Sequence, residues 1–265
     1  MVDIKHKVVA CIPSKESSWI HEYTLTHLSK FCDKIILSDD NAEDDGTRDI
    51  CSSFEKVEYF KREPHDPRDR QGALQRQELL ERAYTHDPDY FLFLDADEMP
   101  SPDIVEWFNS LDNKQDEEVN CWTFPWIHLW GDDSQYRVDS YSNSSGSINW
   151  DPFCKHNTTD YRKGFVARNI PGFELRYDLN QHRCRPSNQP ANVPRPWVDV
   201  TDSPVIIHYG KISEYFTSGK NFRERCEWDH YTVGADKDQR LDHYTNSIAE
   251  DTLQLKKADT KWFWK

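Results

Sequence analysis

The chain has 265 residues, of which 36% are hydrophobic, and its formal net charge at neutral pH is -14. This length and composition suffice for one large domain, or for two small lobes that share a hydrophobic core. The strong negative charge argues against nucleic acid or an anionic membrane as partner, because such partners select basic surfaces.

The cysteines and the hydropathy pattern indicate the compartment. The seven cysteines include no Cys-x-x-Cys pair, so they resemble reduced intracellular thiols and give no zinc signature. No apolar run approaches the roughly 20 residues that a membrane helix requires, and the N-terminus leads straight into an apolar segment. We therefore expect a soluble, cytoplasmic protein with no integral membrane segment.

The first half of the chain alternates between apolar runs and helical patterns. Four apolar runs predict strands, the first of them ended by Pro13: residues 7–12, 34–38, 57–60 and 90–94. Apolar residues near helical spacing predict helices between them, at residues 20–31, 71–84 and 104–111. This alternation predicts an α/β fold with a mostly parallel sheet and flanking helices.

The composition changes after the third helix. Residues 121–130 predict an aromatic strand, and residues 205–208 predict the last clear strand, followed by a polar helix. The polar stretch from 131 to 196 is too long for a structureless loop, so we expect short strands and one mobile segment that covers a site. We treat residues 1–115 and 116–265 as the two halves of one continuous domain.

Carboxylates follow two of the predicted strands. Asp39 and Asp40 end one strand, and Asp95 and Asp97 follow the apolar run 90–94. In an open α/β sheet ligands bind beyond the carboxyl ends of the strands, where we expect the two pairs side by side. The first pair can accept hydrogen bonds from a base or a ribose, and the second can hold a divalent ion that binds phosphate. The alternative is that the second pair only caps the next helix.

These segments, in this order and spacing, resemble the family-two glycosyltransferases of the GT-A fold. The resemblance covers about the first 110 residues and rests on four runs: Val8 to Pro13, Ile35 to Asn41 with Gly46-Thr47, Gly72 to Arg76, and Phe91 to Glu98. It implies a Rossmann-like sheet in the donor-binding half and an irregular acceptor-side half. In one respect the chain departs from the family, because Asn41-Ala42-Glu43-Asp44-Asp45 replaces the usual Asn-Gly-Ser-Thr-like residues. The choice between Asp39 and Asp40 therefore stays open.

The resemblance also implies roles for individual residues. Pro13 would begin the loop under the nucleotide, and Asp39 or Asp40 would contact the base and ribose. Arg76 would lie near the nucleotide, the alternative being an exposed charge on a helix. In the metal site, Asp95 would face both the ribose and the ion, and Asp97 would ligate the ion directly.

A histidine in the second half can complete the metal site. His208 ends an apolar strand, and Gly210 and Lys211 follow as a flexible, cationic exit suited to a phosphate. Many GT-A enzymes place a histidine ligand here, which would suit Mn2+ as well as Mg2+. Lys211 could neutralise the diphosphate. The alternative is a hydrogen-bonded structural histidine.

An inverting sugar transfer also needs a carboxylate base near the acceptor hydroxyl. Five residues remain open for this role: Asp151, Glu174, Asp178, Asp199 and Asp202. We prefer Asp151, because Trp150 and Phe153 could desolvate it and stack on a sugar.

The sequence thus predicts a metal-dependent glycosyltransferase that moves a sugar from a nucleotide-diphosphate donor, UDP favoured, to a glycan or other hydroxyl acceptor. A sugar nucleotidyltransferase would share the sheet but usually opens with a Gly-rich loop, which Ile12 to Glu16 lacks. A phosphatase of the haloacid dehalogenase type would place its Asp-x-Asp nearer the start of the domain. A non-catalytic carbohydrate-binding protein would leave the acid-ended strands unexplained.

Overall fold

The computed structural model describes residues 4–40, 44–62, 71–111, 121–143, 146–153, 164–170, 173–175, 184–186, 197–212 and 253–265. Its main layer is a sheet whose strands lie in the order β14-β6-β11-β4-β1-β2-β3. The strands of this sheet are β1 (Val8–Ser14), β2 (Lys34–Asp39), β3 (Val57–Lys61), β4 (Tyr90–Phe93), β6 (Cys121–Thr123), β11 (Gly164–Arg168) and β14 (Trp197–Asp199). All neighbouring pairs are parallel except those made by β11, which runs antiparallel to β4 and β6.

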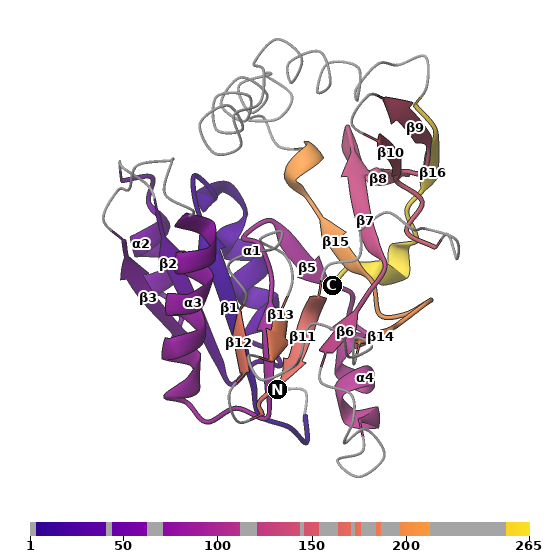
Figure 1. Cartoon of the computed structure of the whole chain (residues 1–265). Helices are drawn as coiled ribbons and strands as arrows, with labels where there is room; N and C mark the ends of the chain where they lie inside the picture. The colour runs from indigo at the N-terminus through magenta and orange to yellow at the C-terminus, as the bar shows by residue number, and fades with distance from the viewer. Residues whose placement is uncertain are drawn as a thin grey trace.

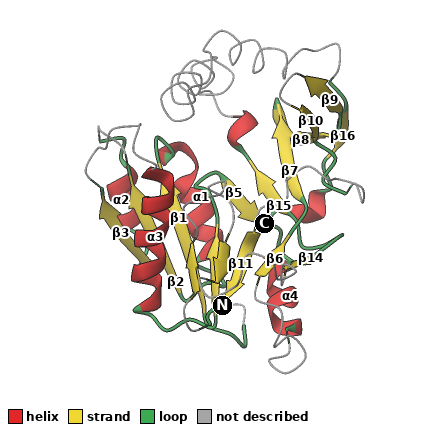
Figure 2. Ribbon diagram, in the orientation of Figure 1, coloured by secondary structure: helices red, strands yellow, loops and turns green. Residues whose placement is uncertain are grey.

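Helices cover both faces of this sheet (Figure 2). They are α1 (Ser18–Leu28), α2 (Thr47–Ser52), α3 (Gln71–Tyr84) and α4 (Ile104–Ser110). The mostly parallel sheet and the helices on its two faces confirm the α/β fold that the sequence predicts.

None of the helices in the described part of the chain combines the length and the apolar character that a membrane span requires.

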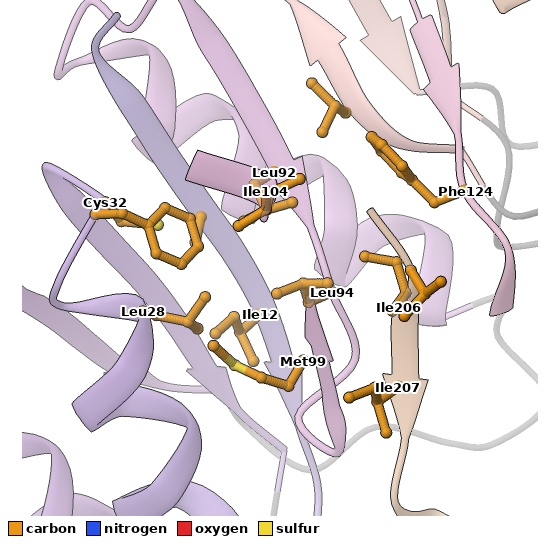
Figure 3. Close-up of a cluster of buried hydrophobic side chains, with 14 of the residues drawn as sticks. Ile12, Leu28, Cys32, Leu92, Leu94, Met99, Ile104, Phe124, Ile206 and Ile207 are labelled. Carbon is orange, nitrogen blue, oxygen red and sulfur yellow. The ribbon is translucent and has the colours of Figure 1, made fainter. Parts of the chain in front are cut away.

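Two hydrophobic clusters fill the two faces of the sheet because side chains alternate along each strand. On β1, Val9 and Cys11 pack with Leu79 and Leu80 of α3. Ile12 lies in the opposite cluster, which continues from α1 through Met99 to Ile206 and Ile207 of a second sheet (Figure 3). Because β1 and β4 contribute side chains to both clusters, both faces of these strands are buried, which explains why they read as unbroken apolar runs.

The second sheet has the order β16-β8-β7-β15-β5 and stands beside the first (Figure 1). Its strands are β5 (Glu98–Pro100), β7 (Trp126–Trp130), β8 (Asp132–Arg137), β15 (Ile206–His208) and β16 (Leu255–Lys257). Strand β15 pairs in parallel with β7 and antiparallel with β5. The remaining strands form two hairpins, one of β9 (Ser140–Asn143) with β10 (Gly146–Asn149), the other of β12 (Phe173–Leu175) with β13 (Cys184–Pro186). The described residues also include two 3-10 turns, η1 (Gly210–Ile212) and η3 (Thr260–Trp262).

Four expectations from the sequence are wrong in detail. Strand β1 continues through Pro13, which is paired with Ser38 of β2, because the ladder with β4 on the other side already ends at Cys11. The predicted strand 121–130 is two strands in different sheets, β6 and β7, separated at Pro125. Strand β16 follows the one expected to be last. The two acid-ended strands β2 and β4 are not side by side, since β1 lies between them.

Other expectations lie partly or wholly outside the described residues. The polar helix expected after residue 208 and the residue Asp178 are among these. The described parts of 131–196 form short strands, as expected, and the idea that a segment there covers a site stays a prediction.

Candidate metal and nucleotide site

The acidic pair after β4 forms a turn that leads from the first sheet into the second. Asp95 to Asp97 connect β4 to β5, and the Glu98 carboxylate accepts a hydrogen bond from the Asp95 backbone N–H at 2.6 Å. Because β5 intervenes before α4, neither Asp95 nor Asp97 caps that helix, whose N-cap residue is Asp103. The alternative role of the pair as a helix cap is therefore wrong.

The structure brings Asp97, in the turn before β5, together with His208, at the end of β15, although the two residues are far apart in sequence. The Asp97 Oδ2 atom lies 3.4 Å from His208 Nε2, and the two side chains are 26% and 16% exposed. The Asp97 carbonyl also accepts a hydrogen bond from the Tyr209 N–H at 2.8 Å. This hydrogen bond joins the backbone after β15 to the turn that contains Asp97. It thereby holds the side chains of Asp97 and His208 near each other.

Gly210 leaves room beside this pair. A Cβ atom at this position would overlap Asp97 Oδ2 and would lie 2.9 Å from His208 Cε1 and 3.1 Å from Nε2. Such close contacts would force one of the two side chains to move. A residue without a side chain is therefore what keeps the carboxylate and the imidazole facing each other.

The donor atoms fit a divalent ion. A carboxylate oxygen and a neutral imidazole are both suitable ligands for Mn2+, and the oxygen suits Mg2+ as well. Two atoms bound at about 2.1 Å to one ion are separated by about 3.0 to 3.4 Å, depending on the angle between the bonds. The 3.4 Å between Asp97 and His208 falls in this range. Within the described ranges, however, no group of three or more such side chains is arranged as a complete metal site.

Asp95, the third expected metal ligand, is paired with a cation. Its Oδ1 accepts a hydrogen bond from the Arg76 guanidinium, on α3. Arg76 is only 9% exposed, which contradicts the alternative that it is an exposed helix charge. The neighbouring Gln75 donates to the Ser38 hydroxyl at 2.9 Å and so ties this part of α3 to the end of β2.

Asp39 and Asp40, the pair expected to contact base and ribose, both have protein partners. Asp39 is 2% exposed and accepts a hydrogen bond from the Tyr59 hydroxyl at 2.7 Å. Lys61 lies 3.4 Å from the same carboxylate, and Arg62 lies 3.3 Å from Asp40. Burial and the bond to Asp39 raise the pKa of Tyr59 to about 12.

A buried histidine lies near both acidic ends. His21 of α1 is fully buried, and its Nε2 is 2.8 Å from the hydroxyl of Ser14 at the end of β1. Burial lowers the pKa of His21 to about 4, although the charges of Asp45, Asp39 and Asp97 oppose this shift. The imidazole is therefore neutral at physiological pH. The sequence analysis missed it, because a histidine on a helix carries no pattern that marks it.

His128 was missed for a different reason. It lies on β7 beside His208, with the two Nδ1 atoms 3.2 Å apart, and it is 5% exposed. Trp126 and Trp150 pack against its ring at centroid distances of 4.3 and 4.8 Å. The alternating Trp126, His128 and Trp130 were a usable signal for one strand face. The partner, 80 positions away, was not visible in the sequence.

The preferred base, Asp151, follows Trp150 and accepts a hydrogen bond from the Phe153 N–H at 3.1 Å. Its charge, together with burial as the larger cause, raises the pKa of Tyr136. The ring of the neighbouring Trp150 packs against His128, with centroids 4.8 Å apart. Of the other candidates, Glu174 lies on β12, Asp199 lies on β14, and Asp202 is exposed. Lys211 lies in η1, directly after Gly210.

Comparison with known proteins gives one family match. Residues 22–143 match the model described as glycosyl transferase family 2. This segment contains Asp39, Asp95, Asp97 and His128 but ends before His208. No curated protein matches the sequence.

Several solved structures are similar over part of the chain. Mannosyl-3-phosphoglycerate synthase from Rubrobacter xylanophilus is 16% identical with a TM-score of 0.31, and the match covers 46% of this chain and 41% of that one. Glucosyl-3-phosphoglycerate synthase from Mycobacterium tuberculosis, crystallised with Mn2+, UDP and glucosyl-3-phosphoglycerate, is 18% identical with a TM-score of 0.32, over 46% and 44% of the two chains. A 4-diphosphocytidyl-2C-methyl-D-erythritol synthase is 15% identical with a TM-score of 0.37, over 62% and 76%. The matched part spans less than half the length of either phosphoglycerate synthase.

Proposed function

We propose that this chain is a metal-dependent glycosyltransferase of the GT-A type, because residues 22–143 match the glycosyl transferase family 2 model. It transfers a sugar, with inversion, from a nucleotide-diphosphate donor to a hydroxyl group of a glycan or glycoconjugate. UDP is the favoured nucleotide, and Mn2+ or Mg2+ is the metal. Residues 1–115 bind the donor and residues 116–265 bind the acceptor.

The observation that carries this proposal is the pairing of Asp97 with His208 next to Gly210. A carboxylate oxygen and an imidazole nitrogen lie 3.4 Å apart beyond the carboxyl end of β4, and the glycine keeps the space beside them open. Ligands of open α/β sheets bind at this edge. Asp97 and His208 would hold the ion directly, and Asp95 is the third proposed ligand.

The donor nucleotide would lie along the carboxyl ends of β1, β2 and β4. Asp39 or Asp40 would accept hydrogen bonds from the base and the ribose, and Pro13 would lie under the nucleotide. Arg76, already held against Asp95, would position that carboxylate between the ribose and the ion. Lys211, in the turn after Gly210, would neutralise part of the diphosphate charge.

The transfer itself requires a base and a stabilised leaving group. A bound divalent ion would neutralise the negative charge that develops on the departing diphosphate. Asp151 would accept the proton of the acceptor hydroxyl, on the face of the sugar opposite the diphosphate, which gives inversion at the anomeric carbon. The indole of Trp150 would offer a flat apolar surface to a sugar ring.

A panel of nucleotide sugars tests the proposal. We expect Mn2+-dependent hydrolysis of one or a few donors in the absence of acceptor, lost on addition of EDTA and in Asp97→Ala. Glycan binding that is insensitive to both EDTA and nucleotide, with no hydrolysis of any donor, would instead identify a carbohydrate-binding protein.

A further inference from the structure

We propose that His128 is a positioning residue for the metal site, because its Nδ1 can accept the Nδ1 proton of His208 and so leave His208 Nε2 with a lone pair for the ion. The inference rests on the proposed function, in which His208 binds the ion. It adds a residue that holds the ligand in its binding-competent form without touching the metal.

Sheet register places the two histidines together. Strand β15 pairs with β7 so that His208 is directly opposite His128, and it pairs with β5 so that His208 is also opposite Glu98. Directly opposed residues of neighbouring strands project to the same face of a sheet. The two imidazole centroids are 4.9 Å apart at an interplanar angle of 63°, and the two Nδ1 atoms are 3.2 Å apart.

If the two neutral rings share a hydrogen bond between their Nδ1 atoms, one proton lies between these atoms, and the ring that carries it decides what His208 can do. In a neutral imidazole one nitrogen donates and the other accepts. If His208 Nδ1–H donates to His128 Nδ1, then His208 Nε2 carries a lone pair, while His128 carries its proton on Nε2. If the roles are reversed, His208 Nε2 carries a proton and cannot bind a metal ion.

The surroundings favour the first arrangement once an ion is present. His208 Nε2 is the nitrogen that faces Asp97, at 3.4 Å, which is longer than an ordinary N–H···O hydrogen bond of about 2.7 to 3.2 Å. This separation is better suited to two ligands of one ion than to a direct bond. In passing from the second arrangement to the first, the proton of His208 moves from Nε2 to Nδ1 and the proton of His128 moves from Nδ1 to Nε2. Both rings stay neutral.

His128 is held firmly enough to act in this way. Its side chain lies on the central strand of a sheet, is 5% exposed, and is enclosed by Trp126 and Trp150. The Trp126 ring also packs against His208, with centroids 5.4 Å apart. Metal-binding histidines generally donate their second ring N–H to such a fixed acceptor, which sets tautomer and orientation together.

Two substitutions at His128 separate the hydrogen bond from packing. His128→Asn keeps an acceptor near the place of Nδ1, whereas His128→Phe keeps a ring of similar shape and removes the acceptor. His6→Phe is the matched control, because His6 is 8% exposed, its Nε2 is 3.2 Å from the Leu111 carbonyl oxygen, and its ring packs on Tyr90 at the amino end of β4. Each variant is first compared with the unaltered chain by thermal unfolding.

Calorimetric titration with Mn2+ in the presence of UDP measures the effect. We expect His128→Phe to weaken Mn2+ binding by about 10- to 100-fold. His128→Asn should stay within about threefold of the unaltered chain, and His6→Phe should bind Mn2+ normally. If Asp97→Ala and His208→Ala abolish binding while His128→Phe binds as the unaltered chain does, the role of His128 is wrong and the proposed function stands. If the unaltered chain does not bind Mn2+ with UDP, both are wrong.

A spectroscopic readout decides the case even if His128→Phe folds poorly. Long-range proton–nitrogen NMR of the unaltered, metal-free chain at about pH 8, where an ordinary histidine is neutral, reports the tautomer of each imidazole. We expect a proton on Nδ1 of one member of the His128–His208 pair and on Nε2 of the other. Addition of Zn2+ as a diamagnetic stand-in should place the Nδ1 proton on His208. Protons on Nε2 of both histidines would overturn the inference.

Discussion

At the carboxyl end of β2, Asp39 and Asp40 are held by Tyr59, Lys61 and Arg62, whereas beyond β4 the Asp97 carboxylate faces a histidine at 3.4 Å. The first pair is stabilised by hydrogen bonds and cations of the protein itself. In the second pair Asp95 is likewise held by a cation, Arg76, whereas Asp97 is placed by the hydrogen bond from the Tyr209 N–H to its carbonyl and lies beside Gly210, which has no side chain. The contacts of the first pair hold the Asp39–Asp40 end of β2, the first edge, firmly within the protein, and the arrangement of Asp97 and His208 beyond β4, the second edge, supports the proposal that a cation binds there.

The largest effect should come from removing the carboxylate of the second edge. Asp97→Ala should abolish Mn2+-supported UDP binding and leave the fold intact, because a partly exposed side chain at the end of a strand contributes little packing. Calorimetry with UDP and Mn2+ measures the loss. Glu106→Ala, which removes an exposed carboxylate from α4, is the control and should bind normally. Unchanged affinity in Asp97→Ala would rule out the assigned site.

The buried histidine between the two edges should make stability depend on pH. The pKa of His21 is about 4 in the folded chain, against 6.5 as its ordinary value. Above the ordinary value the residue is neutral in both states and carries no penalty. As the pH falls from 6.5 towards 4, only the unfolded state gains the proton, so the free energy of unfolding falls by up to about 3 kcal/mol.

Urea unfolding at about pH 7.5 and about pH 4.5, on either side of the ordinary histidine pKa, tests this prediction. The carboxylates of the chain also titrate in part of this interval, so the comparison is made with His21→Gln. That variant should lose less stability on acidification than the unaltered chain. Equal losses in the two chains would show that His21 is not the group that responds.

A substitution at Gly210 tests whether open space is what distinguishes the second edge. Gly210→Ala should cost about 1 to 3 kcal/mol of stability, because the added Cβ meets Asp97 and His208. It should also weaken Mn2+-supported UDP binding by about tenfold, or about 1.4 kcal/mol. Gly131→Ala is the contrast, because Gly131 has a φ of 77° and an added Cβ there would meet no atom within 4 Å, so only backbone strain should appear. Equal metal affinity in both variants would contradict the role of Gly210.

The smallest effect should come from the first edge. Tyr59→Phe removes the hydrogen bond to Asp39 and should cost about 0.5 to 1.5 kcal/mol of stability. Binding of Mn2+ alone should not change, since the Tyr59 hydroxyl donates to the first edge and not to the Asp97 turn. Denaturant unfolding and metal titration on the same preparation give both values. A large loss of metal binding would mean that the two edges are coupled.

The sequence predicted the strands of the first sheet up to β4 well, and for physical reasons. Strands β1, β2 and β4 are covered on both faces, so they read as apolar runs that need no further information. The residue order also predicted that Asp97 and His208 lie at strand ends. Their contact confirms only that they are neighbours, and their role as ligands stays a proposal.

The parts that the sequence could not predict depend on tertiary pairing. Strands β5 and β16 have three residues each and exist because neighbouring strands supply their hydrogen bonds. The break at Pro125 moves the chain from one sheet to the other, which an unbroken aromatic pattern from 121 to 130 concealed. The contact of His128 with His208 arises from the register of β7 and β15, and local sequence does not encode it.

Anomalous diffraction at the manganese edge, from crystals grown with Mn2+ and UDP, tests the central claim most directly. We predict one strong peak within bonding distance of both the Asp97 carboxylate and His208 Nε2, next to the diphosphate of UDP. Clear density for UDP with no peak near either side chain, or with the manganese bound elsewhere, would contradict the account.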